Sequence, residues 1–176
     1  MEVLSIKNLD KTFESGFKLK DINFHINEGE VVSLIGESGS GKTSISKIIM
    51  GLLKAEGEFQ INGKVQMIFQ SPYSSLNPKY KIRDIIAEGV IYQKILKKEE
   101  NLEEYLLSIL NEVGLDKEVL NKYPHELSGG MRQRVEIARA VAVKPNLIIA
   151  DEILTALDAL TQIQILELFQ KLKKNT

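Results

Sequence analysis

The chain has 176 residues, of which 43% are hydrophobic and 27% are charged, as is typical of a globular protein with a buried core. Its formal net charge of −1 gives no general attraction for nucleic acid or for an anionic membrane surface. It contains no cysteine, which excludes disulfides, thiolate zinc sites and a cysteine nucleophile.

The first part of the chain has the pattern of strands. Residues 3–9 and 17–26 alternate apolar with polar side chains, which predicts two half-buried strands. Residues 30–35, EVVSLI, form a short apolar run ending at Gly36, which predicts a buried central strand. Two further strands are predicted over residues 57–63 and 64–69.

Helical spacing begins directly after Gly36 and its loop. Residues 41–53 have apolar side chains on one face of a predicted helix, namely Ile45, Ile48, Ile49, Leu52 and Leu53. From Ile82 to about residue 143 the pattern is again helical, with amphipathic stretches at 82–96, 102–113 and 129–143 and a short helix stopped by Pro124. A buried strand over 146–151 and an amphipathic helix over 159–174 complete the chain.

This order of elements predicts one α/β domain. We expect a mostly parallel sheet with flanking helices, an N-terminal antiparallel β part and an inserted α-helical subdomain. The core is expected over residues 1–71 and 144–176, and the helical subdomain over about 72–143.

Residues 36–43, GESGSGKT, fit the phosphate-binding P-loop pattern G-x-x-x-x-G-K-[ST]. Backbone N–H groups of such a loop wrap a triphosphate, which requires conformations that glycine adopts at low cost. Lys42 would place a positive charge on the outer phosphates, and the Thr43 hydroxyl would bind Mg²⁺. A glycine-rich turn that binds nothing is the alternative, and the flanking strand and helix disfavour it. The predicted nucleotide-binding residues in this segment are Gly36, Glu37, Ser38, Gly39, Ser40, Gly41, Lys42, Thr43 and Ser44.

Two acidic residues close the strand over 146–151. In P-loop enzymes a strand of this kind lies beside the P-loop strand and its terminal acid holds Mg²⁺, usually through water. We assign that role to Asp151, and to Glu152 the role of polarising the attacking water. The alternative is a pair of surface carboxylates, which the P-loop in the same chain makes less attractive.

A second anion-binding pattern stands far from the first. Ser128, Gly129 and Gly130 supply a hydroxyl and two unobstructed N–H groups at a predicted helix start, where Met131 follows. Serine is also a good N-cap, so a simple capped helix is the alternative.

Taken in order, these motifs resemble the ATPase subunit of an ABC (ATP-binding cassette) transporter over essentially the whole chain. GESGSGKT is similar to Walker A, MIFQSP to the segment with the Q-loop glutamine, LSGGMRQR to the family signature, LIIADE to Walker B, and TALD to the D-loop. The resemblance assigns Gln70 to Mg²⁺ and to the attacking water, and it places Asp158 at the end of the D-loop. Phe13 is similar in position to the aromatic that stacks on adenine, although a core phenylalanine is the alternative.

The resemblance implies a function for the second pattern. In the family, two cassettes pack head to tail, and each ATP lies between the P-loop of one and the signature of the other, so Ser128 and its neighbours would hold the partner's γ-phosphate. The implied cofactors are ATP and Mg²⁺. The implied partners are a second ATPase subunit, integral membrane permease subunits and, indirectly, an extracytoplasmic binding protein, with no nucleic acid. The implied location is cytoplasmic, at the inner face of the cell membrane.

Residues 69–78, FQSPYSSLNP, and 123–134, YPHELSGGMRQR, resemble the importer branch for dipeptides, oligopeptides and nickel. Neither segment touches cargo, so the choice between peptide and nickel stays open. A soluble ABC-type ATPase of DNA repair or translation, and a non-hydrolysing nucleotide-binding partner subunit, are the alternative functions. The first usually has a coiled-coil insertion or two cassettes, which this chain lacks.

The sequence departs from the family in three places. Ile153 and Leu154 stand where Pro-Thr is usual, so the resemblance does not extend to the turn after Glu152. The stretch 57–70 is shorter than usual, and no histidine follows Asp158 before the end at Thr176. We expect a truncated chain rather than a naturally short, hydrolytically impaired one. Such a piece should bind nucleotide, hydrolyse it weakly and aggregate readily.

Overall fold

The computed structural model describes residues 1–69, 75–154 and 157–174, with side chains described as far as residue 172. The chain divides into two compact units. Unit 1 comprises Met1–Met67 and Asn146–Asp151, and unit 2 comprises Ile68–Pro145 and Glu152–Thr176. A division into compact units does not test whether the chain is one domain, so the predicted single domain with a helical subdomain over about 72–143 stays a prediction.

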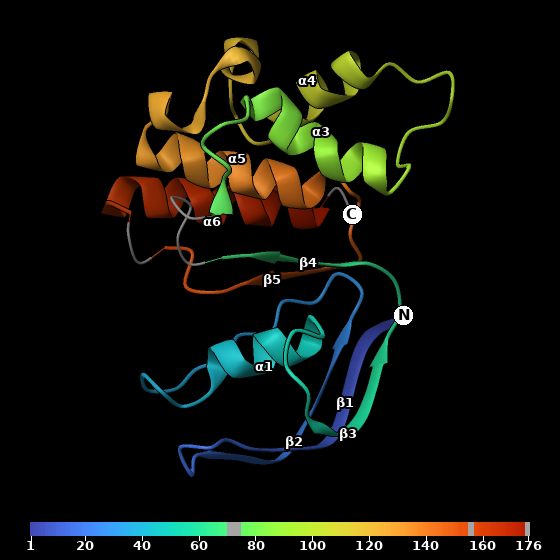
Figure 1. Ribbon diagram of the computed structural model, residues 1–176, viewed down its shortest axis with the longest axis vertical. Coiled ribbons are helices and arrows are strands. Elements are labelled where there is room, and N and C mark those ends of the chain that lie inside the picture. The colour runs from blue at the N-terminus through green and yellow to red at the C-terminus, as the bar shows by residue number, and fades with distance from the viewer. Residues whose placement is uncertain (70–74, 155–156, 175–176) are drawn as a thin grey trace. The chain divides into compact units, whose positions relative to one another are not determined.

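Unit 1 is built on an antiparallel sheet of β1 (Glu2–Thr12), β2 (Lys18–Asn27) and β3 (Glu56–Ile61), in the order β2-β1-β3 (Figure 1). These strands confirm the alternating patterns at 3–9 and 17–26 and the predicted strand near 57–63.

The central strand β1 is bulged, and the bulge decides which of its side chains enter the core. Leu4, Ile6 and Leu9 are all buried, although strict alternation would send Leu9 to the opposite face. The pairing with β2 shifts between Ile6 and Leu9, where Asn8 has a positive φ of 50°. The extra residue restores Leu9 to the core face, as a β-bulge does.

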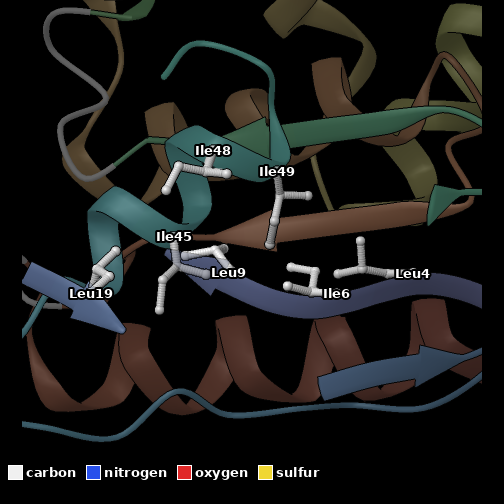
Figure 2. Packing of buried hydrophobic residues seen from close by; sticks show 7 residues of the cluster. All are labelled: Leu4, Ile6, Leu9, Leu19, Ile45, Ile48 and Ile49. Atoms are coloured by element: carbon white, nitrogen blue, oxygen red, sulfur yellow. The ribbon is translucent and has the colours of Figure 1, made fainter. Parts of the chain in front are cut away.

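Helix α1 (Lys42–Ile49) covers the apolar face of this sheet. Its Ile45, Ile48 and Ile49 lie in one cluster with four residues from β1 and β2, namely Leu4, Ile6, Leu9 and Leu19 (Figure 2). Each buried aliphatic side chain contributes about 1.5–3 kcal/mol relative to an exposed one, so this cluster holds α1 against the sheet.

The prediction that Leu52 extends the apolar face of α1 is wrong. The helix ends at Ile49, Met50 occupies the C-cap and Gly51 turns the chain with a φ of 71°. Leu52 is 64% exposed, whereas Leu53 packs against the cluster. Glycine at the helix end explains the stop, because it adopts the left-handed conformation that terminates helices.

The strands β4 (Val65–Ile68) and β5 (Leu147–Ala150) form a separate two-stranded parallel sheet (Figure 1). They confirm the strands predicted at 64–69 and 146–151. Asn146 fixes the entry to the pair, because its backbone N–H donates to the Lys64 carbonyl at 2.8 Å and its Oδ1 accepts from the Lys64 N–H at 2.9 Å. A side chain at Gly63 would collide with Asn146.

The prediction of a buried central strand over residues 30–35 is wrong for this structure. The segment has no strand geometry, and its apolar side chains face water, with Val31 71% and Ile35 94% exposed. A strand needs ladder partners for its backbone groups. Within the described residues, β5 pairs only with β4 and residues 30–35 join neither sheet, so their backbone groups take part in no strand ladder.

Unit 2 is helical. It contains α3 (Ile82–Tyr92), α4 (Leu102–Glu112), α5 (Gly129–Val141) and α6 (Ala159–Lys174), with short 3₁₀ turns at Lys117–Asn121 and Pro124–Glu126. In Figure 1, α3 and α4 lie on one side of α5 and α6 lies on the other. These helices confirm the predicted helical stretches in their order along the chain.

Packing within unit 2 centres on α5. Ile82, Ile86, Leu106 and Ile137 are completely buried, and they come from α3, α4 and α5. The Tyr105 hydroxyl on α4 donates to the Ala142 carbonyl at 2.7 Å, which joins α4 to the end of α5. Helix α5 therefore lies at the centre of this unit, with its N-terminus at the signature residues.

Candidate functional site

The P-loop, residues 36–43, leads into α1 through glycines in unusual backbone conformations. Gly39 and Gly41 have φ values of 82° and 97°, in the left-handed region that other residues rarely adopt. Gly41 is the N-cap of α1. Because glycine has no side chain, the first N–H groups of the helix receive no hydrogen bond from the cap residue's side chain. A methyl group at Gly41 would come within 2.6 Å of Leu19, so the position requires glycine for space as well.

Lys42 turns back into this loop. Its Nζ donates to the carbonyl oxygens of Gly36 and Glu37, both at 2.8 Å, and lies 3.5 Å from the Ser40 hydroxyl. A side chain at Gly36 would come within 2.7 Å of that same hydroxyl. The loop therefore closes around a single ammonium group, which concentrates positive charge at the start of α1.

The remaining P-loop positions lie at the surface. Ser38 and Glu37 are exposed in the loop, and Ser44 is half-buried in the first turn of α1. Their predicted contacts with nucleotide stay predictions.

Thr43 and Asp151 come together within unit 1, although 108 residues separate them in sequence. The Thr43 hydroxyl donates to Asp151 Oδ1 at 3.2 Å. A hydroxyl beside a carboxylate is a hard-oxygen donor set, which fits Mg²⁺, since that ion is commonly held by one or two protein oxygens and the phosphates of its nucleotide. In the described part of the chain no group of three or more His, Cys, Asp or Glu residues is placed to hold a metal by itself.

Two phenylalanines lie near the start of α1. The predicted adenine-stacking residue, Phe13, packs as a partly buried side chain against the core cluster. Phe17, which no motif in the sequence marks, is 38% exposed, and its ring would lie 3.3 Å from a methyl group at Gly41. The two rings are 5.6 Å apart at 42°. The position of Phe17 next to the β1–β2 turn, close to the P-loop helix, makes it a second candidate for contact with adenine, and stacking on Phe13 stays a prediction.

Glu152 follows Asp151 but belongs to unit 2, so its predicted place beside the P-loop stays a prediction. Its backbone is in the left-handed region with a φ of 49°, which is uncommon for a residue other than glycine. Ile153, which stands where the family usually has proline, is buried. Proline disfavours compact backbone conformations in the residue before it, so isoleucine permits this turn at Glu152.

The signature residues form the beginning of α5. The Ser128 hydroxyl accepts from the Met131 N–H at 3.3 Å, which makes Ser128 the N-cap of the helix as predicted. A methyl group at Gly129 would meet open space, whereas one at Gly130 would come within 2.9 Å of the Thr161 methyl on α6. Gly130 therefore permits the close approach of two helices, and contact of any of these residues with a partner's phosphate stays a prediction.

Asp158 begins α6. Its Oδ1 accepts from the Thr161 N–H at 3.0 Å and its Oδ2 from the Thr161 hydroxyl at 2.6 Å. These hydrogen bonds lower the pKa of Asp158, with the Thr161 hydroxyl as the largest cause. The predicted D-loop aspartate thus acts as a helix cap in this chain, while the predicted Gln70 lies outside the described residues.

Comparison with known proteins assigns this arrangement to a family. Residues 19–155 match the family model for the ABC transporter. The chain belongs to the ABC transporter family. The match includes the P-loop, the signature residues and Asp151, and it confirms the family resemblance and the α/β fold class predicted from sequence.

Two relatives narrow the comparison. The oligopeptide transport ATP-binding protein OppF of Streptococcus mutans is 43% identical over 194 aligned residues, covering 98% of this chain and 63% of that protein. The dipeptide transport ATP-binding protein DppF of Lactococcus lactis is 40% identical over 196, again covering 98% of this chain and 63% of that protein. The chain therefore spans less than two thirds of the length of these relatives, which also carry extra residues within the aligned range.

A solved structure supports the fold. CbiO1 from Clostridium perfringens, part of the ABC transporter complex cbiONQ, superposes with a TM-score of 0.85 over 99% of this chain and 74% of that chain, at 24% identity. At that identity the likeness concerns the fold alone. Among the helices that the structure describes, none has the length and apolar character needed to cross a membrane.

Proposed function

We propose that this chain is the ATP-binding and ATP-hydrolysing subunit that powers an ABC importer of peptides. The observation that carries the proposal is the joining of Thr43 to Asp151, next to a loop closed around Lys42. The residues of both contacts lie outside the core cluster, and both place groups for a phosphate and its metal ion at one helix start.

Different residues bind the phosphates, hold the metal ion and act on the attacking water. The ammonium of Lys42 exchanges loop carbonyls for the outer phosphates, and the N-terminal N–H groups of α1 donate to the same phosphates. Thr43 and Asp151 would hold Mg²⁺, which would supply positive charge against the triphosphate. Glu152 takes a proton from the attacking water. Gln70 is proposed to orient that water.

The names of the relatives favour a transport role over DNA repair or translation, and peptides over nickel, because the matched proteins are oligopeptide and dipeptide transport ATP-binding proteins. We propose a second ATPase subunit and membrane permease subunits as partners, with an extracytoplasmic binding protein supplying cargo. The chain would then lie at the cytoplasmic face of the membrane. Ser128, Gly129 and Gly130 would hold the γ-phosphate bound by the P-loop of the second subunit.

An equilibrium titration with Mg-ATP tests the first step. Lys42→Ala should weaken binding by about 100-fold, because a charge-assisted contact to phosphate is lost. Lys47→Ala is the matched control, since Lys47 is an exposed lysine on the same helix, and it should bind as tightly as wild type. Equal affinities for the two variants would remove Lys42, and with it the P-loop assignment, from the proposal.

A second experiment tests hydrolysis and pairing. Glu152→Gln should retain ATP and lose nearly all turnover, and light scattering at saturating Mg-ATP should then detect a two-subunit species, in the presence of the natural partner if the pair is mixed. Wild-type turnover in the Gln variant would remove Glu152 from its role. A wild-type chain that binds ATP but stays inactive with its partner would favour the non-hydrolysing subunit instead.

A further inference from the structure

The signature helix is tied to a distant part of the chain by one arginine. Arg139 on α5 donates from Nη1 to the backbone carbonyl of Ser75 at 2.8 Å. Ser75 is where the described chain resumes after residues 70–74, and it precedes Leu76, which is 2% exposed. Both partners belong to unit 2, so the bond joins the helix that begins at Ser128 to the chain that follows Gln70 in sequence.

A carboxyl group with no hydrogen bond lies one helical turn before this arginine. Glu136 is 1% exposed, and neither of its carboxyl oxygens has a hydrogen-bond partner among the described residues. The Nε2 of Gln133, a turn earlier on α5, is likewise buried with no hydrogen-bond partner in the described part of the chain. The Nη2 of Arg139 stands 3.9 Å from Glu136 Oε1, too far for a hydrogen bond. A buried polar group left in this state destabilises a fold and calls for a functional reason.

The surroundings leave Arg139 as the charge that acts on Glu136. Among residues whose side chains the structure describes, the charged ones on the elements around α5 are Arg83, Asp84 and Glu88 on α3, Glu103, Glu104 and Glu112 on α4, Glu167 and Lys171 on α6, and His125 and Glu126 before Ser128, and α5 itself adds Arg132 and Arg134. Arg83 pairs with Glu103. Burial raises the pKa of Glu136 to about 7, and among the described groups only Arg139 opposes this. The carboxyl therefore changes charge close to neutral pH.

We propose that Arg139 is a positioning residue that holds Ser75 against the signature helix, and that Glu136 competes for this arginine when it is ionised. With Glu136 neutral, Arg139 stays on the Ser75 carbonyl, as the structure has it. With Glu136 charged, the nearest donor that can neutralise it is Arg139 Nη2, and closing that gap draws Nη1 away from Ser75. The protonation of one side chain thus decides how firmly the two segments are joined.

Amide hydrogen exchange on the full chain without nucleotide tests the tie. The probes are the amides of Leu76, Asn77, Lys79 and Tyr80, of which Lys79 and Tyr80 donate to Asn77. Arg139→Gln should lower their protection by about tenfold, the effect of losing one charge-assisted hydrogen bond. Arg139→Lys should retain part of the protection. Arg134→Gln is the control, because Arg134 lies on the same helix and donates to Val113 and Gln164 instead. Unchanged protection in both Arg139 variants would overturn the tie.

The same amides test the role of Glu136. Protection, corrected for intrinsic exchange, should be severalfold higher at pH 6 than at pH 8 in the wild type, and Glu136→Gln should remove the difference. A pH dependence that persists in the Gln variant, or is absent from the wild type, would overturn the competition. Neither result depends on ATP hydrolysis, so failure of the proposed function and failure of this inference can be told apart.

The catalytic consequence rests on the proposed function. Because Ser75 follows shortly after Gln70, loosening it should lower kcat while leaving the KM for ATP unchanged. In the active assembly, kcat should therefore fall as the pH rises through about 7 in the wild type, and Glu136→Gln should lose this ionisation. Identical pH profiles of kcat in the two proteins would overturn the positioning role.

Discussion

The P-loop and the signature segment are both glycine-containing helix starts, yet they are built in opposite ways. At the P-loop the cap position is Gly41, no side chain caps α1, and Lys42 bonds to loop carbonyls. At the signature, the Ser128 hydroxyl already caps α5. The first start leaves its helix N–H groups without a side-chain cap and available to an anion, whereas the second uses its serine to cap one of them, the Met131 N–H. One chain therefore suffices to shape the P-loop, and the shared site proposed for the signature residues would take its nucleotide from a second subunit.

The largest contrast should come from adding a methyl group at each start. Gly41→Ala combines a positive φ with a contact of 2.6 Å to Leu19, and strain of both kinds should lower the free energy of unfolding by about 4 kcal/mol. Gly129→Ala meets open space and should change it by less than about 0.5 kcal/mol. Denaturant unfolding of the two variants measures this difference, and equal stabilities would refute the contrast.

The next contrast concerns the pH dependence of stability, which we expect from the buried Glu136 on the signature helix α5. Because burial raises the pKa of Glu136 from 4.5 to about 7, the folded chain keeps a proton that the unfolded chain releases in this range. Stability is therefore unaffected by this ionisation below about pH 4.5, falls as the pH rises toward 7, and is constant above it. Glu136→Gln should gain on the order of 3 kcal/mol over wild type between pH 4.5 and 8.

Urea unfolding at both pH values measures that gain. Glu88→Gln, an exposed carboxyl on α3, is the matched control and should show no such trend. A parallel loss of stability in wild type and Glu136→Gln would show that Glu136 ionises in the folded chain as it does in the unfolded one.

A smaller effect is expected from the serine at the signature. Ser128→Ala removes the cap of α5 and should cost about 1 kcal/mol of unfolding free energy, whereas Ser38→Ala in the exposed P-loop should cost almost nothing. Ser128→Asp keeps an acceptor for the Met131 N–H and should retain stability, but its charge should prevent ATP-driven pairing. If the Ser128→Asp variant forms pairs at the same ATP concentration as the wild type, Ser128 is not part of an ATP site shared between two subunits.

The smallest effect concerns the base of the nucleotide. If Phe17 contacts adenine, Phe17→Leu should weaken ATP binding by about threefold, roughly 0.6 kcal/mol, while Phe13→Leu should act mainly on stability because that ring packs against the core. Titration and thermal unfolding of the two variants distinguish them. The reverse pattern would assign the base to Phe13, as the family resemblance predicts.

The features that the sequence predicts correctly are those that depend on residues close together in the chain. The P-loop, the Ser128 cap and the order of helices follow from residue types at fixed spacing, so they could be predicted from short windows. The contact between Thr43 and Asp151 needed family knowledge, because no local pattern joins positions so far apart. The prediction of a strand over residues 30–35 is wrong because an apolar run indicates burial only. A strand also needs other strands that supply ladder partners, and a short sequence window does not specify them. Leu9 shows a third case, since a bulge at Asn8 changes the period of β1.

Arg139 and Glu136 lay beyond sequence reasoning altogether. Both stand in a regular helical pattern that predicts α5, and nothing in that pattern distinguishes a buried carboxyl from a solvated one. Their roles became visible only once burial and the Ser75 contact were known.

The exposed run at residues 31–35 has a consequence for the life of the protein in a cell. An uncharged, proline-free stretch of branched side chains held in water is the kind of surface that chaperones capture and that apolar fluorescent dyes report. A polar substitution such as Ile35→Thr should then raise the recovered yield without changing the melting temperature.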